Sequence, residues 1–182
     1  MFIFQKTRVI SAVAIALLAA SFGSQAAGVA ISGVVTVTAT VNNNTCEWKT
    51  TNGNQTVPLG THNLTEVLAG KEISQAFTLE LTKCPASIVV KARVTGNENG
   101  GLFTNASTVS PAATNVGVTI WSNQSGTPVQ VTNGNDSENV TAAGSGTHDA
   151  SLPFIAKLEK ASSGTPTAGD VSVPITMTIV YP

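Results

Sequence analysis

The chain has 182 residues, with 9 Lys and Arg against 10 Asp and Glu, and only 10% of its residues are charged. Such a sequence has no excess of basic side chains to neutralise phosphates, so we expect no nucleic-acid partner. Hydrophobic residues make up 42% of the chain, and after the N-terminal segment described next the remaining length suits one domain with a buried core.

Residues 1–26 have the three-part pattern of a secretory signal peptide. Two basic residues precede an uncharged run from Val9 to Ala20, and small residues follow up to Ala26. The run has about 12 residues, whereas a membrane-spanning helix needs about 20. We therefore expect cleavage after Ala26 and export of the remainder. The alternative is a retained N-terminal anchor helix.

Two cysteines, Cys46 and Cys84, lie in the exported part. An oxidising compartment favours a disulfide between them over two free thiols. A bond that closes a loop of roughly 38 residues would stabilise the fold by about 3 to 4 kcal/mol in the chain-entropy account.

The rest of the chain is rich in Thr, Val, Ala, Ser, Asn and Gly, which favours strands joined by polar turns. One short helical turn is plausible between Asn63 and Lys71. Eight segments combine apolar alternation or continuity with flanking turn residues, and they predict a nearly all-β sandwich: Val29–Val41, Thr56–Leu59, Ser74–Leu81, Ile88–Val94, Val116–Trp121, Val129–Thr132, Leu152–Leu158 and Val171–Tyr181.

Residues that could carry chemistry are few and scattered. His62 and His148 lie apart in polar sequence without metal-ligand spacing, and we expect both to be solvated. Gly144-Ser145-Gly146 lacks the strand-to-helix context of a nucleophile elbow. The sequence predicts no catalytic residue, no metal site and no cofactor, and therefore no enzyme. Trp48 and Trp121 could stack on a sugar, although packing against the core is the more frequent role of such residues.

The N-terminal segment of the exported chain alternates strictly. An extended strand would place its odd-numbered residues on one face, with only Val34 interrupting the polar side. Gly33 in mid-strand weakens a strand and often marks close approach of another backbone. The odd-numbered residues are Val29, Ile31, Gly33, Val35, Val37, Ala39 and Val41.

The C-terminal segment alternates in the same way, and Pro174 within it cannot donate a backbone hydrogen bond. Its apolar residues are Val171, Val173, Ile175, Met177, Ile179 and Tyr181. Periodicity does not decide which face is buried, and we expect the odd-numbered one. Both terminal segments could also be the first and last strands of one closed Ig-like sandwich.

Taken together, these features resemble the pilin family of type 1 and P fimbriae, which the chaperone–usher route assembles. In that family a penultimate Tyr is paired with a Gly fourteenth from the end, and Tyr181 and Gly169 match this pattern. Leu59-Gly60 after the first Cys and the run Leu81 to Pro85 are similar to the family as well.

The resemblance implies an incomplete Ig-like β-sandwich that lacks its final strand. Residues 1–26 would be the signal peptide, residues 27–41 a donor-strand extension and residues 42–182 the pilin domain. The expected donor residues are Ile31, Gly33, Val35, Val37 and Ala39, with Gly33 leaving one pocket open for exchange to begin. The expected acceptor residues are Gly169, Val171, Val173, Ile175, Met177, Ile179 and Tyr181.

The resemblance further implies a structural subunit that passes through the periplasm to a fimbrium on the cell surface and serves adhesion. Its partners would be other pilin subunits, a periplasmic chaperone and an outer-membrane usher, with a host receptor engaged only through the assembled fibre. The alternative is a minor, adaptor or carbohydrate-binding fimbrial subunit. The segments 97–115 and 133–149 match no motif, so the rank of the subunit stays open.

Overall fold

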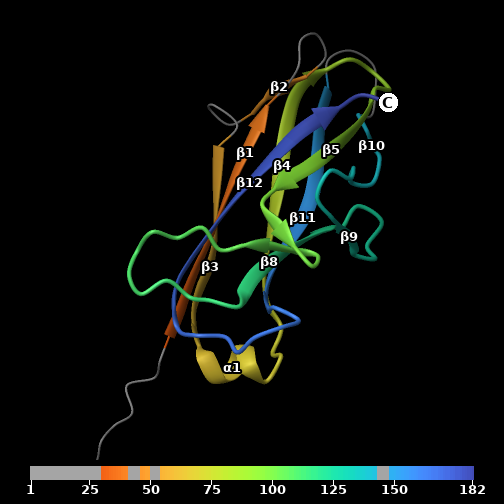
Figure 1. Cartoon of the computed structure of the whole chain (residues 1–182). Coiled ribbons are helices and arrows are strands. Elements are labelled where there is room, and N and C mark those ends of the chain that lie inside the picture. The colour runs from red at the N-terminus through yellow and green to blue at the C-terminus, as the bar shows by residue number, and fades with distance from the viewer. Residues whose placement is uncertain (1–29, 41–45, 50–53, 143–147) are drawn as a thin grey trace, which may run out of the picture.

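The computed structural model describes residues 30–40, 46–49, 54–142 and 148–182. The expected signal peptide lies outside the described residues. The chain is almost entirely strand (Figure 1). In chain order the elements are β1 Ala30–Thr40, β2 Glu47–Trp48, β3 Asn54–Asn63, α1 Leu64–Leu68, β4 Ile73–Cys84, β5 Val89–Gly96, β6 Glu98–Asn99, β7 Leu102–Thr104, β8 Val116–Ser122, β9 Val129–Val131, β10 Val140–Thr141, β11 His148–Lys160 and β12 Gly169–Val180.

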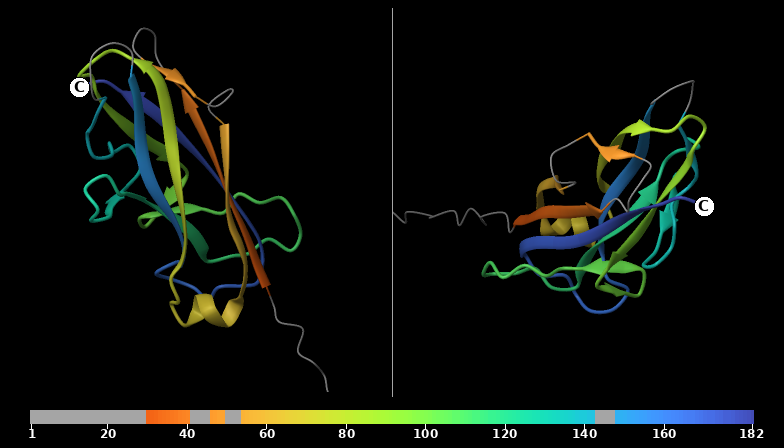
Figure 2. Two further views of the ribbon diagram at one scale, coloured as in Figure 1. Left: turned by 180° about the vertical axis from the view of Figure 1, so that it is seen from behind. Right: turned by 90° about the horizontal axis from the view of Figure 1, so that it is seen from above.

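Two curled sheets pack face to face (Figure 2). One has the strand order β10-β5-β12-β1-β3, and the other has the order β2-β4-β11-β8-β7-β6, with β9 also paired to β8. This Ig-like sandwich confirms the predicted fold class. Each of the eight predicted strands is present, while four strands of two or three residues were not predicted, namely β2, β6, β7 and β10.

The core forms where the apolar residues of the strands alternate toward the other sheet. In β11 every second residue from Ala150 to Leu158 is buried, and the same is true of β12 from Val171 to Ile179. Phe77 of β4 and Phe154 of β11 stack with ring centroids 5.5 Å apart. Alternation of period two is what places these side chains on one face of each pleated strand.

The short helix α1 connects β3 to β4 at one end of the sandwich (Figure 1). Its first turn is capped because the backbone N–H of Asn63 donates to Glu66 Oε2 at 3.1 Å. Hydrogen bonding from Lys71, followed by that backbone bond, lowers the pKa of Glu66 below its ordinary value of 4.5. The five-residue α1 is the one helix in the described ranges, and it is too short to cross a membrane.

A carboxylate with a lowered pKa contributes stability that is present above its unfolded-state pKa and is lost as the pH falls through its folded-state pKa. We predict that Glu66→Gln reduces the free energy of unfolding at neutral pH and that this difference from the wild type shrinks below about pH 4.5. Urea unfolding of both proteins between neutral and acidic pH measures it. A difference that does not change with pH would contradict this role of Glu66.

Cys46 and Cys84 form a disulfide across 38 residues, as predicted. Cys84 ends β4, and Cys46 directly precedes β2. Both cysteines are buried in the core. The bond therefore joins the residue before β2 to the end of β4, and these two strands are neighbours in the sheet that does not contain β1.

We predict that the double variant Cys46→Ala/Cys84→Ala loses about 3 to 4 kcal/mol of unfolding free energy, because the open chain gains loop entropy in the unfolded state. Guanidinium unfolding measures the loss, and the reduced wild type serves as control. An unchanged midpoint in both proteins would show that the bond does not constrain the unfolded chain.

Candidate functional site: the groove that holds β1

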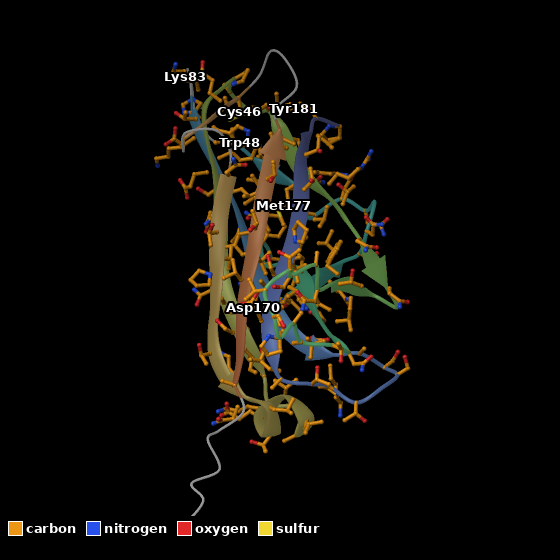
Figure 3. All side chains as sticks on the ribbon, turned by 60° about the vertical axis from the view of Figure 1, so that its left-hand side comes forward. Cys46, Trp48, Lys83, Asp170, Met177 and Tyr181 are labelled. Atoms are coloured by element: carbon orange, nitrogen blue, oxygen red, sulfur yellow. A yellow bond between two sulfur atoms is a disulfide. The ribbon has the colours of Figure 1, made fainter. Side chains whose placement is uncertain are left out.

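The strand β1 lies between the last strand, β12, and the third, β3 (Figure 3). Along β12 its register runs from Ile31 opposite Gly169 to Thr40 opposite Thr178. Along β3 it pairs antiparallel over Ala30 to Thr38. The backbone of β1 is thus hydrogen-bonded on both sides by the body of its own chain.

The inward face of β1 is buried from Ile31 to Val37. Ile31, Val35 and Val37 each have 0% of their surface exposed, whereas Ser32 and Thr38 on the other face are exposed. Ala39 pairs in register with Met177. Burial of a Val or Ile side chain contributes about 1.5 to 3 kcal/mol, so these three side chains together contribute several kcal/mol.

The opposite wall of this groove is β12. Its odd-numbered residues face the core, which is the face that we expected to be buried. The buried ones are Val171, Val173, Ile175, Met177 and Ile179, and Tyr181 beyond the strand is partly buried against the same core. Pro174 is exposed and directly precedes the ladder between β12 and β5, which begins at Ile175.

Gly33 lies where β1 crosses an irregularity of β3. The register shifts between Gly33 and Val34, and Gly60 opposite has a φ of +81°, a value that favours glycine. A Cβ at position 33 would lie 3.1 Å from Leu59 Cβ. Leu59 itself is buried, so its side chain occupies the space that a larger residue at position 33 would need.

Gly169, at the start of β12, is enclosed by backbone. Its φ is +151°, and a Cβ there would lie 2.4 Å from the carbonyl oxygen of Pro111. The next residue, Asp170, donates its N–H to that same Pro111 oxygen at 2.8 Å and accepts from the N–H of Ala113. Only glycine allows the two backbones to approach this closely. This is a physical reason for a glycine at the position that the sequence motif marked.

The segment 105–113 supports the first half of β12. It bonds the edge of β12 that faces away from β1, before the ladder with β5 begins at Ile175. The amide of Asn105 donates to the carbonyl oxygens of Ala113 and Asp170 and accepts from the N–H of Ser172. The N–H of Ala106 also donates to the Ser172 carbonyl oxygen at 2.8 Å. No sequence motif pointed to Asn105 as a support of β12, because its partners there, Asp170 and Ser172, lie 65 and 67 residues further along the chain.

The same segment also covers part of the outer face of β1. A hollow of about 320 Å³ is lined by Val34 of β1, by Asp170 to Ser172 of β12 and by residues 106–109. Val34 is the one large apolar residue on the otherwise polar side of β1, and it is half-buried here. Val34, which interrupts the alternation, thus lines a hollow together with residues 106–109.

The disulfide determines where β1 enters the groove. Only residues 41–45 separate the end of β1 at Thr40 from Cys46, which is bonded to Cys84. Cys46 and Tyr181 lie at the same end of the sandwich (Figure 3). We call this the disulfide end, and the opposite end, with Gly169 and α1, the helix end.

Polar side chains outside this pairing make structural contacts in some places and none in others. His62 bonds the carbonyl oxygen of Leu59 at 2.6 Å and is half-buried, and His148 is half-buried as well, so the expectation that both are solvated was wrong. Lys157 lies 4.8 Å from the centroid of Trp121, whose Nε1 donates to Thr119. The described residues contain no cluster of three metal-ligating side chains.

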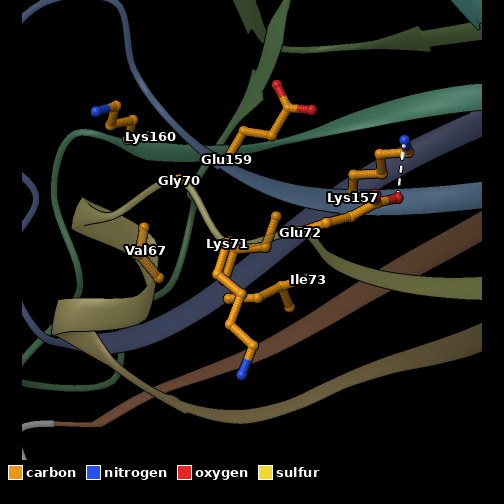
Figure 4. A pocket seen from close by; sticks show the side chains of 9 residues that line it. Val67, Gly70, Lys71, Glu72, Ile73, Lys157, Glu159 and Lys160 are labelled. Carbon is orange, nitrogen blue, oxygen red and sulfur yellow. Dashed lines mark ion pairs between the residues drawn. The ribbon is translucent and has the colours of Figure 1, made fainter.

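A second hollow, of about 400 Å³, lies between α1 and β11 (Figure 4). Val67, Ile73 and Leu158 supply apolar walls, and an ion pair of 3.0 Å joins Lys157 to Glu72 at its rim. No nucleophile lies beside a base among these residues, so the hollow offers no catalytic arrangement.

We predict that Gly169→Ala costs about 3 kcal/mol or more of unfolding free energy, because it combines an unfavourable φ with a clash against the backbone of 111–113. Gly126→Ala is the matched control, since Gly126 also has a positive φ of +80° but no atom within 4 Å of the added Cβ. Equal losses in the two variants, measured by chemical unfolding, would show that the enclosure of Gly169 is unimportant.

Comparisons with known proteins give the class of protein, the fimbrial proteins, and show that solved pilus structures share its fold. A family model described as fimbrial protein matches residues 35–181. The crystal structure of the P pilus rod subunit PapA matches with a TM-score of 0.59 and 17% identity over 76% of this chain and 100% of that one. A chaperone–usher pilus structure, solved to explain rod uncoiling, matches with a TM-score of 0.59 and 18% identity over 79% of this chain and 91% of that one. No curated protein matches the sequence.

The chain belongs to the fimbrial protein family. This confirms the family that the terminal motifs indicated. It is accordingly a structural subunit that associates with other pilin subunits in a surface fimbrium, and it is not an enzyme. At 17% and 18% identity the two solved structures show the shared fold and no further property.

Proposed function

We propose that this subunit polymerises by donor-strand exchange, with β1 of one copy filling the groove between β3 and β12 of the next. One observation carries the proposal. β1 supplies buried side chains and two hydrogen-bonded ladders to the fold, yet the chain connects it to the body only through residues 41–45. A strand of the same sequence from another copy can take its place, because its alternating apolar side chains suit the same groove.

The energetics favour a groove that is always occupied. Removing β1 would expose the apolar residues of β12 and β3 that now lie beside Ile31, Val35 and Val37 in the same sheet. It would also leave two strand edges without hydrogen-bond partners. Both features lead to aggregation, so a subunit whose β1 is withdrawn to serve a neighbour needs a capping partner before assembly.

A periplasmic chaperone would supply that cap, and an outer-membrane usher would be the site where the next subunit replaces it. The expected export signal in residues 1–26 and the disulfide between Cys46 and Cys84 both suit passage through an oxidising periplasm. A host receptor would then be engaged only through the assembled fibre.

The position of β1 supports a shaft or adaptor subunit over an adhesive one. The groove strand directly follows the expected signal peptide, so no receptor-binding domain stands between them. Carbohydrate stacking on Trp121 finds no support, because Lys157 lies over its ring. Trp48 packs against the core.

We predict that deleting residues 27–39 leaves a subunit that stays soluble only as a chaperone complex and forms no fibres, because it can fill no neighbour's groove. Electron microscopy of cells and co-purification with the chaperone measure the two outcomes. Ser32→Ala is the control, since Ser32 is on the exposed face of β1 and its loss should leave fibres intact. Normal fibres from the deletion variant would refute donor-strand exchange.

A further inference from the structure

The direction of β1 is unusual within the sandwich. It runs parallel to β12, whereas every other ladder between described strands is antiparallel. The disulfide explains this direction. Cys46 follows Thr40 after only residues 41–45, so β1 has to end at the disulfide end, where β12 also ends.

The direction of an inserted strand determines where the rest of its chain lies. A strand from a second copy that enters the groove as β1 does would leave it at the disulfide end. Its own body then begins within the reach of residues 41–45, about 20 Å at full extension. The disulfide ends of the two copies therefore meet. A strand inserted in reverse leaves at the helix end instead, so that the copies follow one another head to tail.

We propose that two copies exchange β1 in the observed direction and register to form a closed, two-fold symmetric dimer. Each β1 then lies between β12 and β3 of the other copy. Every contact of the single chain is retained, including the fit of Gly33 against Leu59. Exchange of an identical element is a low-cost route to a dimer for this reason.

The proposed dimer cannot grow. Both grooves are filled and both strands are used, whereas head-to-tail insertion always leaves one groove and one strand free. The inference rests on the contacts of β1 within one chain and holds whether or not the fibre forms by strand exchange. The direction in which the strand is inserted therefore determines whether the copies form a closed dimer or a chain that can grow.

The charges at the disulfide end are compatible with such a contact. Lys49 pairs with Glu80 and lies 3.6 Å from Asp149, and Lys83 pairs with Glu47 at 2.8 Å. Both signs are therefore interspersed on this end. A two-fold axis can therefore place a residue of one sign opposite a residue of the other.

Thr38 and Thr176 test the proposal because they are register partners across β1 and β12 and both are exposed. Neighbouring strands lie about 4.8 Å apart, so cysteines at these positions can form a disulfide. The exported protein is prepared as two single variants, Thr38→Cys and Thr176→Cys. They are refolded together at low and high concentration and then mildly oxidised.

We expect a covalent dimer that contains one chain of each variant, identified by a non-reducing gel and peptide mapping. Its fraction should rise with protein concentration during refolding, and light scattering should give twice the monomer mass without larger species. A protein that stays monomeric at every concentration would overturn the proposal, and so would dimers without the bond between positions 38 and 176.

The matched control mixes Ser32→Cys with Thr176→Cys. In the observed direction Ser32 is opposite Asp170, so position 176 is about 20 Å further along the strand. A bond between positions 32 and 176 therefore reports reversed, head-to-tail insertion. If it alone appears, in a ladder of growing species, the closed dimer is refuted and the fibre proposal is supported. If only the bond between 38 and 176 appears, in a species limited to two chains, the closed dimer stands.

Discussion

The apolar groove between β3 and β12 has to be filled, and the rest of the structure depends on this constraint. The sheet that contains β12 would be divided into two parts without β1, because β3 contacts it only through that strand. Ile31, Val35 and Val37 then close the core from the N-terminal side of the chain. The fold is therefore completed by a segment that is also the most easily separated part of the chain.

Two glycines on either side of this groove are required for different reasons. Gly169 is enclosed by the backbone of 111–113 at a positive φ, so it fixes the start of β12. Gly33 has an ordinary strand conformation, and the side chain of Leu59 occupies the space in front of it. The first glycine is a matter of backbone geometry, and the second concerns the fit between an inserted strand and its groove.

The buried faces of β1 and β12 could be predicted from the alternation of apolar and polar residues alone. The odd-numbered residues of residues 31–37 and 171–179 face the core because a pleated strand leaves them no other arrangement once one face is buried. The direction of β1 could not be predicted, since it follows from a disulfide to a strand in the other sheet. The bonds of Asn105 to β12 and the hollow that Val34 shares with residues 106–109 could not be predicted either, because both depend on segments that meet only in the fold.

The central claim is that a strand from one copy fills the groove of another in the assembled fibre. Electron cryo-microscopy of purified fibres tests it most directly, because the density of residues 41–45 shows which body each groove strand belongs to. We expect that the strand between β3 and β12 of every internal subunit continues into the neighbouring body, in the direction opposite to that of β1 here. Fibres in which each groove holds the β1 of its own chain would contradict it.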